Sequence, residues 1–253
     1  MTPPDARKRL RLRRIRITGW TSLTALLVTI VSFLTWFHIV LPADRDATLD
    51  VFRDDRVVFT TGDDTLVLTP ASGQSHQGIL FFPGAKVDPY SYLYPFVDVV
   101  AEGATLVVME PLFNMALFDA RDLEALTSPY PEINQWTLVG HSLGGVRACM
   151  LSEYPQVSNL VLLASFCAND LSKAELTVLQ VAGDRDSLIE ESARADAEAL
   201  LPPNSAELIT LAGANHASFG TYGPQPGDGL ATLSQEDMRD AITAIFREQI
   251  LID

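Results

Sequence analysis

Short apolar runs alternate with helix-compatible stretches over residues 78–250, and this alternation restricts the fold more than any other feature. Apolar runs without alternating polar positions are typical of strands buried on both faces. They are GILFF (78–82), ATLVVM (104–109), WTLVG (136–140), LVLLA (160–164), TVLQVA (177–182) and ELITLA (207–212). The intervening stretches predict helices near 91–102, 118–127, 143–154, 189–200 and 235–250, the last opened by a Ser234/Asp237 cap. We therefore expect an α/β fold with a doubly wound, mostly parallel sheet and its site at the carboxyl ends of the strands.

Residues 44–77 have a different pattern, which predicts a connector followed by short antiparallel strands. The expected strands are TLDVF (48–52), RVVFTT (56–61) and TLVLTP (65–70), with Gly62-Asp63-Asp64 as a turn.

An uncharged run from Ile17 to Ala43 precedes this body. As a helix, residues 17–41 would extend roughly 38 Å, more than the roughly 30 Å hydrocarbon core of a bilayer. Trp20 and Trp36 lie near its two ends, as interfacial anchors would. A cleaved signal peptide is the alternative, but its apolar region spans only about 7 to 15 residues. We expect an uncleaved signal-anchor helix.

Charge is distributed unevenly along the chain. Residues 1–16 hold seven basic side chains and one acidic one, a net charge of +6. Because the whole chain has a net charge of −14, the remaining 237 residues have a net charge of −20. Because basic segments stay cytoplasmic, we expect a cytoplasmic leader (1–16), a membrane span (17–41) and a domain outside the cytoplasm (44–253). The acidic body disfavours nucleic acid as a partner. Oligomeric state is not indicated.

The two cysteines are Cys149 and Cys167. An exported domain could oxidise them to a disulfide. Cys149 falls two turns into an expected helix and Cys167 follows an expected strand, so we expect two buried thiols rather than a bridge.

The sequence Gly140-His141-Ser142-Leu143-Gly144-Gly145 follows the apolar run WTLV and precedes a helix-compatible stretch. This is a G-x-S-x-G pattern between strand and helix, where glycines permit a sharp turn that exposes the serine. An ordinary capping serine is the alternative. The context favours Ser142 as a nucleophile.

A serine nucleophile needs a base, and the chain has four histidines. His38 lies in the apolar run, His76 precedes the first parallel strand, and His141 belongs to the turn itself. His216 follows the last expected strand, in the order Ser, acid, His that such sites show. We therefore expect His216 to be the base.

The orienting acid should lie between these two residues at a strand end. Asp184 and Asp186 follow TVLQVAG, and Asp170 follows LVLLASFCAN. We favour Asp186, because the turn Asp184-Arg185 would direct it back over the strand end. Asp184 and Asp170 remain alternatives.

Two backbone amides should stabilise the oxyanion. We expect them to be those of Leu143 and of Ala85, in the turn Pro83-Gly84-Ala85-Lys86. Lys86 and Tyr222 are the expected substrate-binding residues.

The run LFFPGAKVDPYSY, the elbow VGHSLGGVRA, the turn VAGDRDSL and the loop NHASFGTYGPQPGDG together resemble the α/β-hydrolase superfamily, nearest to its small dienelactone-hydrolase-like branch. The resemblance covers roughly residues 78 to 250. It implies ester hydrolysis through an acyl-enzyme with Ser142, Asp186 and His216 as triad. Dienelactone hydrolase itself has a cysteine nucleophile, so its lactone substrate is not implied. The short segment SFCANDLSKAEL leaves no room for a cap domain, which predicts an open site.

We expect a membrane-tethered serine esterase that acts on a small-molecule ester and needs no metal or organic cofactor. An acyltransferase with the same triad is one alternative, separable by the ratio of hydrolysis to transfer. A catalytically silent binding module is another, and failure of Ser142 to react with a fluorophosphonate would indicate it.

Overall fold

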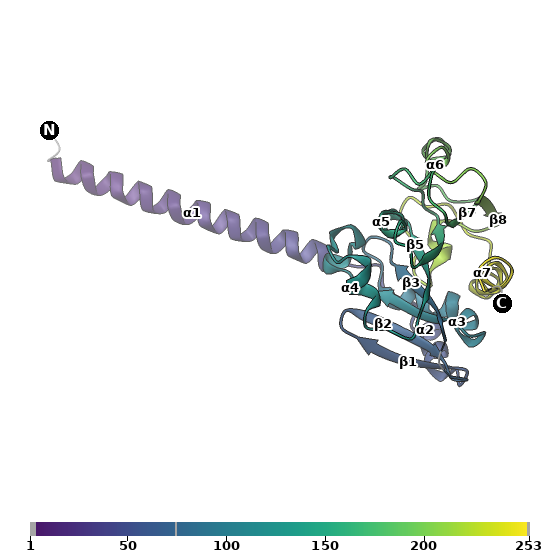
Figure 1. Cartoon of the computed structure of the whole chain (residues 1–253). Coiled ribbons are helices and arrows are strands. Elements are labelled where there is room, and N and C mark those ends of the chain that lie inside the picture. The colour runs from purple at the N-terminus through teal and green to yellow at the C-terminus, as the bar shows by residue number, and fades with distance from the viewer. Residues whose placement is uncertain (1–3, 74, 252–253) are drawn as a thin grey trace. The chain divides into compact units, whose positions relative to one another are not determined.

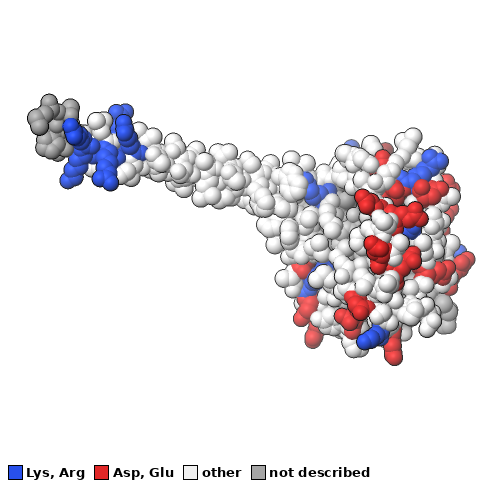
Figure 2. Space-filling model, turned by 90° about the horizontal axis from the view of Figure 1, so that it is seen from above, with Lys and Arg blue, Asp and Glu red and all other residues white. Residues whose placement is uncertain are grey.

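The computed structural model describes residues 4–73 and 75–251. The chain forms two compact units, Met1–Ile39 and Val40–Asp253. The first is the helix α1 (Pro4–His38), and residues 1–3 of the expected leader lie outside the described residues. Its part from Ala6 to His38 is long and apolar enough to cross a membrane, a test that a signal sequence also passes. Basic side chains gather at the beginning of α1, whereas acidic ones cover much of the visible face of the second unit (Figure 2).

An eight-stranded sheet forms the centre of the second unit, in the order β1-β2-β4-β3-β5-β6-β7-β8. Its strands are β1 (Val57–Gly62), β2 (Thr65–Pro70), β3 (Gln77–Phe82), β4 (Thr105–Met109), β5 (Gln135–His141), β6 (Val157–Leu163), β7 (Thr177–Gly183) and β8 (Ala206–Leu211). The β1–β2 and β2–β4 pairs are antiparallel, and the other neighbours run parallel. This confirms the predicted α/β fold with a mostly parallel sheet.

Two hydrophobic cores cover the two faces of this sheet, because successive strand side chains point to opposite faces. Val161 and Leu163 of β6 belong to one core, and Leu160 and Leu162 belong to the other. The first core packs under α2 (Arg45–Arg53), α3 (Leu93–Ala101) and α7 (Gln235–Gln249). The second core packs under α4 (Leu123–Thr127) and α5 (Leu143–Leu151). The remaining helix of this unit, α6 (Glu191–Glu198), follows β7. Figure 1 shows α3 and α7 on one side of the sheet and α5 on the other.

The expected strand TLDVF is wrong, because residues 45–53 form the helix α2. Asp44 caps this helix: its Oδ1 accepts a hydrogen bond of 2.9 Å from the Ala47 N–H. Ala47 and Val51 are both buried and lie four residues apart, so they occupy one helical face. The four-residue spacing of these two apolar side chains favours a helix, and it outweighs the strand preference of the β-branched residues Thr48 and Val51.

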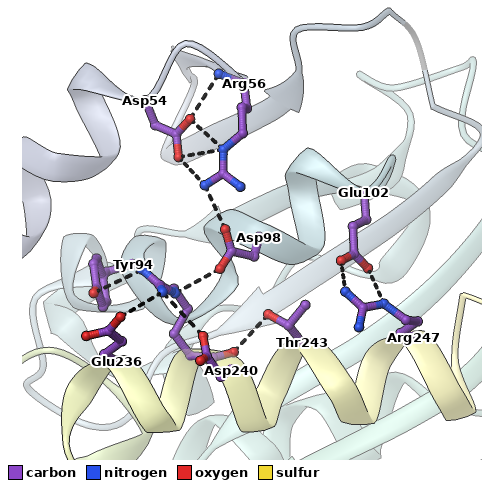
Figure 3. Close-up of polar contacts among 10 residues, drawn as sticks. Asp54, Arg56, Tyr94, Asp98, Glu102, Glu236, Asp240, Thr243 and Arg247 are labelled. Atoms are coloured by element: carbon purple, nitrogen blue, oxygen red, sulfur yellow. Dashed lines mark hydrogen bonds and ion pairs between the residues drawn. The ribbon is translucent and has the colours of Figure 1, made fainter.

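The outer face of α3 and α7 carries a network of ion pairs (Figure 3). Asp98 of α3 accepts a hydrogen bond from Arg56 at 2.7 Å and forms an ion pair with Arg239 of α7 at 2.8 Å. Arg247 of α7 pairs with Glu102, just beyond α3. The predicted cap of α7 is confirmed, since Ser234 Oγ accepts from the Asp237 N–H. These contacts hold α7 to α3 along their polar sides.

Cys149 and Cys167 form a disulfide, so the expectation of two thiols is wrong. Their Cα atoms are 5.6 Å apart, within the range that a disulfide requires. Cys149 lies in α5, Cys167 lies four residues beyond β6, and both belong to the second core. The segment after β6 therefore lies beside α5, which the separate helix and strand patterns do not indicate.

The parallel strands end at a common edge, which collects the segments that follow them. Ser142 follows β5, the segment 184–187 follows β7, and a short 3₁₀ helix, η4 (His216–Phe219), follows β8. Between β6 and β7, residues 164–176 contain no helix or strand, in agreement with the predicted absence of a cap domain.

Candidate active site

Ser142 occupies a strained turn between β5 and α5. Its φ of 52° and ψ of −127° lie outside the regions that non-glycine residues normally adopt. The turn requires glycines on either side: a Cβ on Gly144 would lie 2.0 Å from Phe82 O, and one on Gly140 would lie 2.4 Å from Gly144 O. The glycines of the G-x-S-x-G sequence are thus needed because backbone atoms of neighbouring segments occupy the space that a Cβ would fill. The strain places a half-buried serine at the edge of the sheet, at the N-terminus of α5.

His216 and Asp186 form a direct hydrogen bond. Nδ1 of His216 is 2.9 Å from Oδ2 of Asp186, and both side chains are largely buried. Burial alone would raise the pKa of Asp186, but hydrogen bonds from His216 and from the Leu188 and Ile189 amides outweigh it and hold the pKa below its ordinary value. The carboxylate therefore stays charged at neutral pH and holds a proton on Nδ1, which leaves Nε2 of His216 as an acceptor.

The two alternative acids lie elsewhere. Asp184 Oδ1 accepts from the Gly213 N–H at 2.7 Å and so ties the end of β7 to the end of β8. Asp170 is exposed and accepts from the Ser172 N–H at 2.9 Å, as a turn residue does. Of the three candidates, Asp186 is therefore the one that the structure brings to His216.

The turn after β3 offers a single amide to a ligand. Pro83 has no N–H, the Gly84 N–H donates to Tyr92 Oη at 2.9 Å, and the Lys86 N–H donates to Asn114 O at 2.7 Å. Within the described part of the chain, no acceptor binds the Ala85 N–H. The Leu143 N–H opens α5, whose first amides lack intrahelical acceptors. These are the two amides that the sequence predicts for an oxyanion hole.

Comparison with known proteins gives a family. A model described as "Alpha/beta hydrolase family" matches residues 78–240, more than half of the chain. The chain belongs to the α/β-hydrolase family. A crystal structure of a predicted CIB-like hydrolase from Thermoplasma acidophilum is similar in fold, with a TM-score of 0.51, 13% identity, and coverage of 76% of this chain and 97% of that chain. A search of curated proteins finds no match. Family and fold together support a hydrolase.

Sequence reasoning missed a buried relay of hydrogen bonds in this α/β hydrolase. It joins residues 83–86, here called the oxyanion turn after the predicted role of Ala85, to the loop that carries His216, here called the histidine loop. His141 Nε2 is 3.0 Å from His216 O, a group that only accepts, so Nε2 carries a proton. Burial, and secondarily the nearby His216, lower the pKa of His141 well below its usual value, so the ring is neutral. Nδ1 then accepts from Tyr92 Oη at 2.9 Å, and Tyr92 Oη accepts from the Gly84 N–H. No local sequence pattern marks this relay.

We expect Tyr92→Phe to lower kcat about tenfold and to destabilise the fold by about 1–3 kcal/mol. The change leaves the buried Gly84 N–H and His141 Nδ1 without partners, and it disconnects the oxyanion turn from the histidine loop. The matched control is Tyr130→Phe, whose hydroxyl contacts Thr65 Oγ1 at 3.2 Å away from this edge. Steady-state kinetics and thermal unfolding of both variants decide the role. A loss of stability in Tyr92→Phe without any loss of kcat would make the relay purely structural.

Asp228 is a second residue that the sequence did not reveal, since it is one acid in a glycine-rich and proline-rich segment. Its Oδ1 accepts from the His216 N–H at 3.2 Å, and its Oδ2 accepts from the Ala217 N–H at 2.9 Å. The carboxylate thereby fixes the beginning of η4. The irregular segment that contains Asp228 therefore positions His216.

The two expected binding residues, Tyr222 and Lys86, lie in different loops. The Tyr222 ring is 6.1 Å from the His141 ring, and its hydroxyl donates to Gln225 Oε1 at 3.0 Å. Lys86 is half-buried in the oxyanion turn and has a φ of 58°. A cavity of about 340 Å³ adjoins the acid: Asp186, Ser165, Gln180 and Arg194 are among its lining residues. Across residues 4–73 and 75–251, no group of three or more metal-ligating side chains is found.

Proposed function

We propose that this chain is a serine hydrolase that cleaves carboxylic esters through an acyl-enzyme on Ser142. The observation that carries the proposal is the 2.9 Å hydrogen bond from His216 Nδ1 to Asp186 Oδ2, at the same strand edge as the strained turn of Ser142. Contact between the His141 and His216 rings, with centroids 4.8 Å apart, brings the histidine loop against the residue next to Ser142. Nucleophile, base and acid thus come from β5, β8 and β7.

In the proposed reaction, Ser142 Oγ attacks the ester carbonyl while His216 Nε2 takes the hydroxyl proton. Asp186 holds the ring orientation and stabilises the imidazolium. The N–H groups of Leu143 and Ala85 donate to the oxyanion. Collapse expels the alcohol, which takes its proton from His216. Water then attacks the acyl-enzyme by the same steps, releasing the carboxylic acid and restoring Ser142.

Hydrolysis of esters with different acyl chain lengths by the full chain in detergent tests this function. We expect release of one acid and one alcohol per ester cleaved. Transfer of most acyl groups to an added alcohol instead of water would assign the acyltransferase alternative. Absence of turnover on every ester, together with intact folding, would favour a silent binding module.

We also propose that α1 anchors the chain in a membrane with the catalytic unit outside the cytoplasm. Seven basic residues precede the uncharged run, and such segments stay cytoplasmic. The Cys149–Cys167 disulfide supports this side, because the cytosol keeps thiols reduced. Protease added to intact cells or spheroplasts should digest the catalytic unit. Its protection until the membrane is permeabilised would contradict the proposed topology.

A further inference from the structure

The segment that follows α1 is built into the edge of the sheet that carries the candidate active site. The Leu41 N–H donates to Lys86 O at 2.7 Å, and the Asp88 N–H donates to Leu41 O at 3.0 Å. Three residues further on, the Asp44 N–H donates to Thr221 O at 2.6 Å. Residues 41–44 therefore connect the oxyanion turn with the loop that follows His216.

The chain between α1 and this segment is short. The helix ends at His38, and Leu41 is already hydrogen-bonded to the oxyanion turn. Three residues extend at most about 10 Å even when fully stretched. If α1 spans a bilayer, the oxyanion turn must therefore lie close to the surface from which the helix emerges.

An apolar loop borders the same turn. Residues 112–118, here called the rim loop, have the sequence LFNMALF and contain no charged residue. Its large side chains are exposed: Leu112 by 60%, Leu117 by 38% and Phe118 by 49%. Burial of such side chains is favourable because it removes apolar surface from water. Their exposure beside a site is typical of an interaction surface rather than of a solvated loop.

The rim loop is fixed to the oxyanion turn and packs against α5. Asn114 O accepts from the Lys86 N–H at 2.7 Å, and residues 116–118 pack against α5, which begins with Leu143. The backbone of the loop is strained, with φ of 57° at Phe113 and 54° at Asn114. Positive φ at non-glycine residues clusters at functional sites. The loop is thus held as part of the rim of the active site.

We propose that the rim loop lies in the surface of the bilayer that α1 spans, and that the substrates of Ser142 are long-chain acyl esters embedded in that bilayer. The proposal rests on the proposed function and on the proposed anchor. An apolar loop inserted at the level of the headgroups lets the acyl chain leave the lipid phase next to the oxyanion turn without crossing water. The absence of charge from the loop agrees with this, because a charged side chain in the same place would resist insertion.

The first test measures insertion and does not depend on catalysis. The full chain is reconstituted in phosphatidylcholine vesicles with Leu117→Cys carrying an environment-sensitive NBD fluorophore. Leu208→Cys is the matched control, because Leu208 is exposed by 39% and lies on the edge strand β8. Cys149 and Cys167 are bonded to one another and buried, so the added thiol takes the label. Lipids with a spin label near the headgroup should quench the probe at residue 117 at least about twofold more than at residue 208.

The second test measures which ester is preferred, as the ratio of two rates on the same vesicles. One probe is a fluorogenic oleate ester embedded in the bilayer, and the other is water-soluble p-nitrophenyl acetate. In the double variant Leu112→Ser/Leu117→Ser, the embedded-to-soluble ratio should fall at least about tenfold, because the apolar contact with the bilayer is lost. The ratio should not change in Val58→Ser or Leu208→Ser, which remove exposed apolar side chains from the two edge strands.

Equal quenching at residues 117 and 208 would overturn the proposal that the rim loop lies in the surface of the bilayer. An unchanged ratio in the rim-loop variant, or turnover of the acetate alone by the wild type, would overturn the substrate class while leaving the esterase proposal in place. Absence of turnover on both esters would contradict the proposed function and with it the substrate class. Quenching at residue 117 would still decide whether the rim loop inserts into the bilayer.

Discussion

Ser142→Ala should lower kcat for a soluble ester by about 10⁵- to 10⁶-fold, because no covalent intermediate can form without the hydroxyl. The residual rate comes from ester binding and from the amides of Leu143 and Ala85, which the substitution leaves in place. The measurement is kcat of the purified full chain in detergent, with thermal unfolding as a check on folding. Ser152→Ala is a matched control in the same chain segment, since its hydroxyl donates to Cys149 O away from the turn.

The control should keep kcat within about threefold of the wild type, as surface and capping changes remote from chemistry do. If Ser142→Ala retained more than about 1% of the wild-type kcat, Ser142 would not be the nucleophile.

Asp186→Asn should lower kcat by about 10³- to 10⁴-fold while the protein remains folded. An amide in place of the carboxylate can donate to His216 Nδ1, which stabilises the tautomer whose Nε2 carries a proton and cannot act as a base. Adding Ser142→Ala to this variant should cost little beyond Ser142→Ala alone, because the triad acts as a unit.

Two matched substitutions test whether the effect belongs to Asp186. In Asp184→Asn the amide oxygen can still accept from the Gly213 N–H, so kcat should change by less than about threefold. Asp170→Asn alters an exposed turn and should have as small an effect. A collapse of kcat in either variant, with near-normal kcat in Asp186→Asn, would transfer the orienting role to that residue.

The parts of this structure that follow from local sequence could be predicted. Apolar runs without polar alternation located the buried strands, because a strand covered on both faces has no solvent side. The glycines around Ser142 indicated the turn, since Gly140 and Gly144 have no room for a Cβ. Once the strands were placed, their common carboxyl edge indicated where His216 and the acidic residues would lie.

The remaining features depend on contacts between segments far apart in sequence. Tyr92 and His141 are 49 residues apart, and nothing in either segment indicates that they meet. Asp228 binds the backbone of His216 and Ala217, contacts that depend on the path of an irregular loop. The Cys149–Cys167 bridge depends on how α5 packs beside the segment that follows β6. Only the packed sheet brings these groups together.

The central claim, that Ser142 is an activated nucleophile, is tested most directly by intact-mass spectrometry after exposure of the full chain to a fluorophosphonate. We predict one covalent phosphonyl adduct per chain, located by peptide mapping on Ser142. The adduct should be absent in Ser142→Ala and should form much more slowly in Asp186→Asn. No adduct on the folded wild-type chain, or an adduct on another residue that persists in Ser142→Ala, would contradict the claim.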